Sequence, residues 1–315
     1  LLMKPRALYY DILKYQQQNL NLLNDKFDVI TLNSPKDNVD RILENIELLF
    51  APLGYCVDKK YIDRCSSLKV IASNTTGIPH IDKQYADSKK IKICALHDEQ
   101  GFLKTITPTA EHTVGLIISI LRKIPSAHHA ASHGNWDRRP WGSPKMLSRM
   151  TIGIVGLGRL GKQIKHIMTS FGTKVLFFDP YVKGGEKNLK IMAKKSDILS
   201  INAIANEETD NLIDSDILKL LPNGAVVVNT ARGEILDLDA LLDLLESGHL
   251  SGAALDTIDG EYNVEFSSVF FESRVATYAR EHNNLILTPH IGGSTIDAWT
   301  ETERRVINKS VEILC

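Results

Sequence analysis

Short apolar segments alternate with helical stretches along the whole chain. In the first hundred residues, the apolar runs are short and end at polar residues, and they predict strands at 7–10, 27–30, 48–51 and 70–72. Stretches with helical character lie between some of these strands, at 37–45 and 59–65. This alternation is typical of βα units that build a parallel sheet.

A second series of the same kind begins at Met150. Its predicted strands are 151–155, 174–178, 198–201, 225–229, 252–255 and 285–287. The helices predicted between them include 162–170 and 238–246, and Gly248 is a good stop signal for the second of these. A last helix is expected from about Thr295 to the end of the sequence.

The two series are joined by a helix and a less regular segment. The helix is predicted at about 109–123, because Pro108 precedes it and Pro125 follows it. The segment 128–147 has no clear periodicity, and we expect it to be a connection that runs over the surface.

Composition narrows the class of protein. A chain of 315 residues suits two domains, and its 43% hydrophobic and 24% charged residues are ordinary for a globular protein. A net charge of −1 gives no reason to expect nucleic acid or a membrane as partner, so a small ligand is favoured. The four cysteines lack metal-site spacing, and no secretory signal is recognisable, which together favour a cytoplasmic protein without a metal.

A glycine motif follows the first strand of the second series. The strand 151–155 runs directly into Gly156-Leu157-Gly158-Arg159-Leu160-Gly161, and a helix follows at once. In this context the first glycine allows a tight turn, the second lets the backbone approach a pyrophosphate, and the third lets helix and strand pack closely. The free N–H groups at the helix start attract phosphate charge. The motif therefore predicts a dinucleotide site.

An acidic residue indicates which dinucleotide is bound. Asp179 ends the next predicted strand, 18 residues after Gly161, which is near the spacing expected for a residue that binds the adenosine ribose. Its carboxylate would accept hydrogen bonds from both ribose hydroxyls and would repel a 2′-phosphate. We therefore expect NAD rather than NADP.

Two further polar groups follow predicted strands of the same sheet. Arg232 comes soon after the strand 225–229, and His290 comes soon after the strand 285–287. Ligands bind at the carboxyl edge of such sheets. Arginine holds a carboxylate through two parallel hydrogen bonds, and histidine exchanges a proton near neutral pH. This pair suits hydride transfer from a 2-hydroxy acid.

The motifs together resemble one family. The chain is similar to the D-isomer-specific 2-hydroxyacid dehydrogenases, which include phosphoglycerate, glycerate, hydroxypyruvate/glyoxylate and D-lactate dehydrogenases. Beside the nucleotide loop, the segments that carry the resemblance are 74–82 (Asn-Thr-Thr-Gly-Ile-Pro-His-Ile-Asp), 110–113 (Ala-Glu-His-Thr) with Arg122, 134–136 (Gly-Asn-Trp), 229–233 (Asn-Thr-Ala-Arg-Gly), 253–256 (Ala-Ala-Leu-Asp) and 288–293 (Thr-Pro-His-Ile-Gly-Gly).

The resemblance implies a role for particular residues. The catalytic set would be Arg232 as substrate-binding cation, His290 as acid/base and Glu261 as its carboxylate partner. The implied substrate contacts are Asn74, Thr75, Thr76, Gly77, Arg232 and His290. The implied cofactor contacts are Gly156, Gly158, Arg159, Leu160, Gly161, Asp179, Thr230, Ala231, Asp256 and Gly292.

One departure from the family pattern leaves an alternative open. The glutamate of the family is usually followed by proline, whereas Tyr262 follows Glu261 here. Asp259 is a rival for the carboxylate role, although it lies two residues closer to the strand. His80, His128, His129 and His133 have no spacing that indicates a site, and we expect them to be structural or on the surface.

The resemblance also implies an architecture and a set of partners. We expect an α/β protein with two Rossmann-like doubly wound parallel-sheet domains and an interdomain cleft. Residues 1–105 with 296–315 would form the substrate domain, and residues 106–295 the NAD-binding domain inserted into it. The family is usually dimeric, and 128–147 is a plausible part of the contact. No large C-terminal regulatory domain is expected.

Two classes of function are consistent with these features. The first is a dehydrogenase that acts on a small 2-hydroxy or 2-keto acid, and the second is an NAD-binding regulatory or corepressor-like scaffold on the same fold. The loop 51–55 carries no basic residue, which favours an unphosphorylated substrate. The segment 291–295 instead resembles the phosphoglycerate branch, so the substrate stays open.

Overall fold

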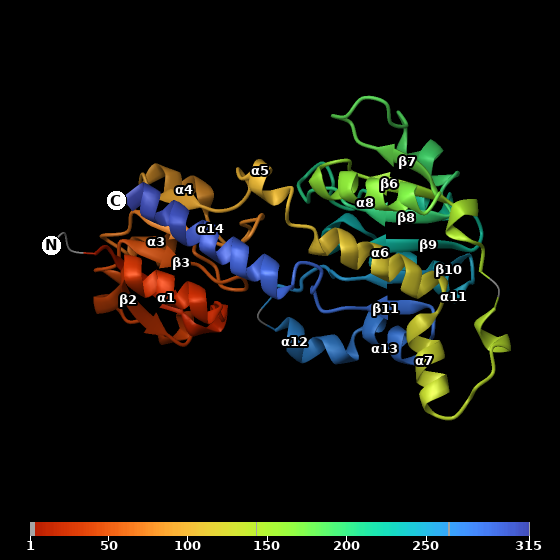
Figure 1. Ribbon diagram of the computed structural model, residues 1–315, viewed down its shortest axis with the longest axis horizontal. Coiled ribbons are helices and arrows are strands. Elements are labelled where there is room, and N and C mark those ends of the chain that lie inside the picture. The colour runs from red at the N-terminus through yellow and green to blue at the C-terminus, as the bar shows by residue number, and fades with distance from the viewer. Residues whose placement is uncertain (1–3, 143, 264, 315) are drawn as a thin grey trace. The chain divides into compact units, whose positions relative to one another are not determined.

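The computed structural model describes residues 4–142, 144–263 and 265–314, and they form two compact units. The first unit comprises 1–106 and 294–315, and the second comprises 107–293. Each unit is an α/β structure built on one open parallel sheet (Figure 1). The expectation of an α/β protein with two doubly wound parallel-sheet domains is therefore confirmed.

The sheet of the first unit has five strands in the order β2-β1-β3-β4-β5. The strands are β1 (Arg6–Tyr10), β2 (Asp28–Leu32), β3 (Leu48–Phe50), β4 (Val70–Ala72) and β5 (Lys92–Cys94). Both faces are covered, because alternate residues of one strand enter different cores: Ala7 and Tyr9 belong to one, and Leu8 and Tyr10 to the other. The helices of the unit are α1 (Gln17–Lys26), α2 (Asp40–Leu43), α3 (Lys59–Asp63), α4 (Lys83–Ser88), α5 (Gln100–Leu103) and α14 (Ile296–Leu314).

The sheet of the second unit has six strands in the order β11-β10-β9-β8-β6-β7. The strands are β6 (Thr151–Val155), β7 (Lys174–Phe178), β8 (Ile198–Ile201), β9 (Ala225–Asn229), β10 (Leu250–Leu255) and β11 (Leu285–Leu287). The chain goes from β6 to β7 on one side and then returns to β8 on the other side of β6. Such a reversal is where ligands bind in open α/β sheets.

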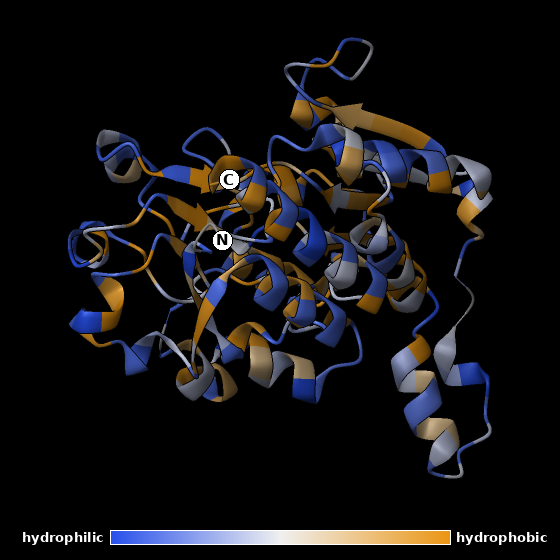
Figure 2. Cartoon of the chain, turned by 60° about the vertical axis from the view of Figure 1, so that its left-hand side comes forward, coloured by the Kyte–Doolittle hydropathy of each residue, from blue (hydrophilic) through white to orange (hydrophobic). Residues whose placement is uncertain are grey.

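Helices cover both faces of this second sheet. They are α6 (Pro108–Leu121), α7 (Ile124–Ser132), α8 (Arg159–Ser170), α9 (Leu189–Ala193), α10 (Ser215–Lys219), α11 (Leu238–Glu246), α12 (Phe266–Val269) and α13 (Arg274–Glu281). Helices α6 and α8 lie side by side on one face of the sheet (Figure 1). Ile117 of α6 and Ile164 of α8 share a core with Ile152 and Val228. The strands are largely hydrophobic, whereas the helices alternate hydrophobic and polar residues (Figure 2).

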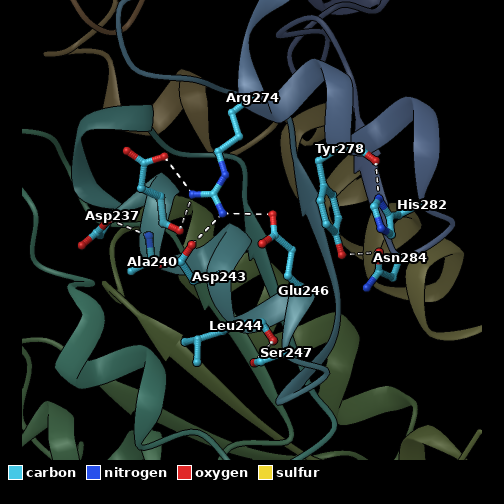
Figure 3. A network of polar contacts seen from close by, with 11 residues as sticks. Asp237, Ala240, Asp243, Leu244, Glu246, Ser247, Arg274, Tyr278, His282 and Asn284 are labelled. Carbon is cyan, nitrogen blue, oxygen red and sulfur yellow. Dashed lines mark hydrogen bonds and ion pairs between the residues drawn. The ribbon is translucent and has the colours of Figure 1, made fainter.

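The helices α11 and α13 are joined by a charged cluster on the opposite face. The guanidinium of Arg274 contacts the carboxylates of Asp239, Asp243 and Glu246, at 3.3, 2.6 and 3.0 Å (Figure 3). All four side chains are substantially exposed, so each pair contributes little stability by itself.

Most predicted elements are present, and the corrections concern the polar ones. All strands predicted for the second series are found, whereas β5 was not predicted, and the helix expected at 37–45 is reduced to α2. The expectation of an irregular connection from 128 was wrong in part. Pro125 lies in the first turn of α7, so it begins a new helix as well as following α6. In the part of the chain that is described, no helix is long and apolar enough to span a bilayer.

Candidate active site

The nucleotide loop has the geometry that its glycines predict. Gly156 has a φ of +88°, and a Cβ there would lie 2.8 Å from the backbone of Ala203. A Cβ on Gly161 would lie 2.2 Å from the carbonyl oxygen of Gly156. Both positions therefore need glycine for folding, since one requires a left-handed conformation and both lack room for a side chain.

Gly158 differs from its two neighbours in the motif. Its φ is −70°, and a Cβ there would have no heavy atom of the protein within 4 Å. The fold itself does not require glycine at this position. The open space lies at the N-terminus of α8, a twelve-residue helix whose first N–H groups attract negative charge. These observations fit the close approach of a pyrophosphate.

Asp179 follows β7 directly and is held in the turn beside the loop. One of its carboxylate oxygens accepts the N–H of Leu157 at 2.8 Å, and the other accepts the N–H of Tyr181 at 2.9 Å. Each oxygen retains a lone pair for a further donor. The Tyr181 hydroxyl donates to Glu208, which raises the pKa of that phenol and brings the loops after β7 and β8 together.

Tyr181 and Ile204 are both highly exposed beside this loop, and the sequence analysis did not single them out. Their common signal is an apolar residue just after a strand that flanks the glycine loop.

Three neighbouring strands carry the candidate catalytic residues. Arg232 follows β9, Glu261 follows β10 and His290 follows β11, and these strands are adjacent in the order β11-β10-β9. Because the strands are parallel, their carboxyl ends meet at one edge of the sheet. The fold of the second unit thus brings these three segments to one place.

His290 is paired with Glu261. Its Nδ1 lies 2.8 Å from Oε1 of Glu261, whose side chain is mostly buried. Asp259 is exposed, and the hydrogen bonds found among the described residues do not join it to His290. Geometry therefore selects Glu261 over Asp259 as the partner. No hydrogen bond to the Nε2 atom of His290 is found within the described part of the chain, and about a third of the side chain is exposed.

The backbone of His290 is held in an uncommon conformation. Its φ is +51°, which non-glycine residues adopt rarely and which is frequent at functional sites. Its N–H donates to the carbonyl oxygens of Asp256 and Thr288, both at 2.9 Å.

The buried Asp256 organises the same loop with its side chain. Its carboxylate accepts the hydroxyl of Thr288 at 2.5 Å, the N–H of Ile291 at 3.0 Å and the N–H of Gly292 at 2.8 Å. The Nε2 atom of His112, in α6, lies 3.2 Å from the same carboxylate. A Cβ on Gly292 would lie 2.8 Å from this carboxylate, so glycine is needed there. Asp256 thus holds the histidine loop in place.

The segment after β9 is held just as firmly. The buried side chain of Asn229 donates to the carbonyl of Arg232 at 2.8 Å and accepts the N–H of Ala231 at 3.0 Å. The hydroxyls of Thr230 and Thr113 are 2.7 Å apart. Arg232 is half-buried, and its Nη1 donates to the carbonyl of Ala231 at 2.7 Å. The guanidinium is thus presented by a loop whose polar groups are satisfied.

The arginine loop also packs against the segment that carries Glu261. A Cβ on Gly233 would lie 1.9 Å from the backbone nitrogen of Asp259. The two main chains are therefore in direct contact, and only glycine allows this approach.

The remaining substrate candidates, Asn74, Thr75, Thr76 and Gly77, lie in the first unit. There the hydroxyl of Thr75 donates to the carbonyl of Gly77 at 2.6 Å and lies 2.8 Å from the hydroxyl of Ser73. The loop is thus fixed by its own hydrogen bonds. His80 at its end is buried, which lowers its pKa to about 4, and this agrees with a structural role.

Three residues of this site were not assigned a role from the sequence. Thr288 and His112 complete the bonds of Asp256, and Tyr262 contacts His290. All three lie within the motifs or beside them, but their chain spacing gives no signal of contact. No cluster of potential metal ligands occurs among the residues that the structure describes.

The chain was compared with known proteins. The family model described as "D-isomer specific 2-hydroxyacid dehydrogenase, NAD binding domain" matches residues 114–292, more than half of the chain. The glyoxylate reductase of Thermofilum pendens is 31% identical over 302 residues, which cover 90% of this chain and 84% of that protein. The chain belongs to the D-isomer specific 2-hydroxyacid dehydrogenase family.

Solved structures share the fold of this D-isomer specific 2-hydroxyacid dehydrogenase. D-Lactate dehydrogenase of Aquifex aeolicus, solved with NAD and lactic acid, has a TM-score of 0.81 at 22% identity and covers 98% of this chain and 94% of its own. An NADPH-dependent glyoxylate/hydroxypyruvate reductase of Sinorhizobium meliloti, solved with NADP and malonate, has a TM-score of 0.79 at 22% identity, with coverages of 96% and 92%.

Membership of the family settles the class of reaction. The 2-hydroxyacid dehydrogenase is an oxidoreductase that transfers a hydride between NAD(H) and a small hydroxy or keto acid. The second unit contains the matched NAD-binding region, including the glycine loop and the histidine loop.

Proposed function

We propose that Arg232, Glu261 and His290 are the catalytic residues of this dehydrogenase, acting on a small unphosphorylated 2-keto or 2-hydroxy acid. The observation that carries the proposal is the 2.8 Å contact between His290 Nδ1 and Glu261 Oε1, in the loops after β11 and β10. Arg232 follows β9, which is the next strand of the same sheet. A histidine, a carboxylate and an arginine at one sheet edge supply the groups that this chemistry needs.

Each group then has a distinct task. Arg232 binds the substrate carboxylate, since a guanidinium matches its geometry with two hydrogen bonds. The Nε2 of His290 removes the proton of the hydroxyl in the oxidative direction and supplies it in the reductive direction. Glu261 accepts a hydrogen bond from the Nδ1–H group, which fixes the tautomer and stabilises the charged imidazole. When bound, the nicotinamide accepts or donates the hydride.

The proposed cofactor contacts follow the carboxyl edge of the second sheet. Gly156, Gly158, Arg159, Leu160 and Gly161 would hold the pyrophosphate, and Asp179 would hold the adenosine ribose. Thr230, Ala231, Asp256 and Gly292 would lie near the nicotinamide. Because the carboxylate of Asp179 repels a 2′-phosphate, we propose NAD in preference to NADP, unlike the NADPH-dependent relative of Sinorhizobium meliloti. Stronger binding of NADPH than of NADH would contradict this preference.

The substrate proposal rests on the first unit. The loop 51–55 contains no basic residue that would hold a phosphate. The backbone of residues 74–77 would contact the carboxylate of the substrate. We expect a panel of ketoacids to show faster turnover of glyoxylate and hydroxypyruvate than of 3-phosphohydroxypyruvate. The opposite order would contradict the proposal and would agree with the resemblance of 291–295 to the phosphoglycerate branch.

The experiment that tests the catalytic residues follows NADH oxidation at 340 nm with that panel. His290→Gln should lose nearly all turnover, by roughly 10³-fold or more, while it still binds NADH. His282→Gln is a matched control, because His282 is exposed and packs against Tyr278 of α13. Native protein that binds NADH tightly but reduces none of the ketoacids would instead support a regulatory or scaffold protein.

The segment 124–147 suggests the partner of the protein. Helix α7 has no buried residue, and Trp136 and Met146 after it are 92% and 63% exposed. Apolar surface of this kind is typical of a protein interface. We propose that this segment binds a second copy of the chain and forms a homodimer. We also propose that the protein is cytoplasmic, because the thiols of Cys56, Cys65 and Cys94 are free and a reducing compartment would keep them so. Sedimentation equilibrium should show a dimer that Trp136→Ser weakens, and a monomeric native protein would exclude it.

A further inference from the structure

Tyr262 lies against the imidazole of His290. Its hydroxyl oxygen is 3.2 Å from His290 Nδ1, the same atom that Glu261 contacts at 2.8 Å. The ring centroids of Tyr262 and His290 are 5.9 Å apart, with the planes inclined by 51°. Two consecutive residues of one loop thus both reach a single nitrogen of the acid/base.

We propose that Tyr262 is a positioning residue of the reaction. Its hydroxyl oxygen and the carboxylate of Glu261 both accept a hydrogen bond from the Nδ1–H group of His290. The proposal rests on the proposed role of His290 as acid/base. Two acceptors around one N–H restrain rotation of the imidazole more than one acceptor does. They also stabilise the charged form, in which Nε2 carries the proton that ketoacid reduction consumes.

The direction of the hydrogen bond follows from Glu261. A carboxylate only accepts hydrogen bonds, so the proton between Glu261 and His290 lies on Nδ1. The hydroxyl of Tyr262 must then accept at this position as well, and its own proton points elsewhere. At 3.2 Å it is the weaker of the two acceptors, since hydrogen bonds of this kind are usually shorter.

Burial, more than any single nearby charge, keeps the phenol of Tyr262 neutral. Burial raises the pKa of Tyr262, the nearby guanidinium of Arg232 lowers it, and Glu261, Glu234 and Asp256 raise it further. The net effect is a pKa above the ordinary value of 10.0. The phenol is therefore protonated throughout the pH range in which a histidine acts as acid/base, and it contributes a fixed dipole there.

The loop that carries Tyr262 packs against the loop that presents Arg232, because the main chains of Gly233 and Asp259 are in contact. The hydroxyl of Tyr262 contacts the proposed acid/base, and the charge of Arg232 lowers the pKa of the phenol. A side chain in this position can couple the orientation of the two groups that hold the substrate. We therefore expect its removal to affect turnover more than cofactor binding.

A second tyrosine–histidine pair in the same unit provides a control. The rings of Tyr278 and His282 are stacked, with centroids 4.0 Å apart and an angle of 7° (Figure 3). The Tyr278 hydroxyl donates to Asn284 at 3.1 Å, and His282 Nδ1 lies 3.1 Å from the carbonyl oxygen of Tyr278. Packing of a tyrosine on a histidine therefore does not by itself bring the hydroxyl to the imidazole.

The experiment compares Tyr262→Phe with Tyr278→Phe, because each change removes one hydroxyl and keeps the ring. For Tyr262→Phe, kcat for ketoacid reduction should fall roughly three- to tenfold, the size expected for one lost neutral hydrogen bond. The inflection at which kcat falls with rising pH should move to lower pH by roughly half a unit. The KM for NADH should not change, and Tyr278→Phe should match the native protein in all three measurements.

A further variant separates positioning from folding. Tyr262→Gln places an amide oxygen near the same nitrogen and should keep the inflection closer to that of the native protein than Tyr262→Leu does. This pair also carries the test if Tyr262→Phe does not bind NADH. Native kcat and an unmoved inflection in Tyr262→Phe, or equal inflections in the Gln and Leu variants, would overturn the proposal. His290→Gln tests the underlying function independently, since an active His290→Gln would overturn the role of His290 itself.

Discussion

The glycine loop allows folding and cofactor binding to be separated by single methyl groups. Gly158→Ala adds a Cβ that meets no protein atom within 4 Å, at a φ of −70° that alanine readily adopts. The folded state should therefore accept the methyl group. Because alanine restricts the unfolded chain more than glycine does, the free energy of unfolding should stay the same or rise by up to about 1 kcal/mol.

Cofactor binding should respond in the opposite direction. The added methyl group takes up the space in which the backbone would approach a pyrophosphate. Overpacking of a close contact costs about 1 to 3 kcal/mol, which corresponds to roughly a 5- to 150-fold weaker Kd for NADH. The variant should thus be fully folded and poor at binding.

Gly161→Ala is the contrasting variant. Its Cβ would lie 2.2 Å from the Gly156 carbonyl oxygen, a backbone atom that cannot turn away, and 3.3 Å from Cγ2 of Ile154. Helix α8 would have to move from the sheet, with a loss of about 3 kcal/mol or more of unfolding free energy. The main effect of Gly161→Ala should therefore be a lower free energy of unfolding, whereas the main effect of Gly158→Ala should be weaker binding of NADH.

The assays are urea unfolding followed by circular dichroism and a titration of NADH fluorescence. Native affinity for NADH in Gly158→Ala would refute the location of the pyrophosphate. Equal destabilisation of the two variants would refute the description of the loop, since only one of the two positions is closely packed.

Three further predictions concern other buried polar groups. Glu261→Gln should lower kcat roughly 10- to 100-fold and move the inflection of its pH profile to lower pH, because the charged imidazole of His290 loses its carboxylate partner. Asp259 is exposed, so Asp259→Asn should change neither kcat nor the inflection. Asp256→Asn should cost about 2 to 4 kcal/mol in urea unfolding, because an amide NH2 then faces the buried N–H donors at Gly292 or Ile291, and a cost below 1 kcal/mol would contradict this. Burial lowers the pKa of His80 from 6.5 to about 4, so the unfolded chain takes up a proton first as the pH falls, and about 2 to 3 kcal/mol of stability should be lost between pH 7 and 4.5. His80→Phe should flatten that dependence, and an unchanged slope would refute the cause.

The sequence predicted the second sheet well because its strands are buried on both faces. Strands such as β9 are continuous apolar runs with clear polar ends, so their bounds follow directly from the pattern. No residue of helix α7 is buried, so the regular apolar spacing that predicts a core-facing helix is missing there. Two residues, Arg122 and Lys123, separate α7 from α6, and Lys123 is in a left-handed conformation. The short strand β5 was missed because it is an edge strand with one buried residue, so no apolar run marks it in the sequence.

The sequence predicted those site residues whose position depends on the end of a strand, but not those whose position depends on the conformation of a loop. Arg232 and His290 each lie three residues after a strand, so their convergence follows from the parallel sheet. The choice between Glu261 and Asp259 could not be made, because two positions of a loop differ by a conformation that chain spacing does not specify. The contact of Tyr262 with His290 depends on that same loop conformation.

The contact between Gly233 and the backbone of Asp259 has a consequence for attempts to change the substrate. Since these two main chains touch, the loop that presents Arg232 cannot move without the loop that presents Glu261 and Tyr262. A substitution that moves either loop would shift the carboxylate-binding cation and the partners of the acid/base together. A library aimed at new ketoacids should therefore keep residues 232–233 and 258–262 fixed and vary the loops of the first unit.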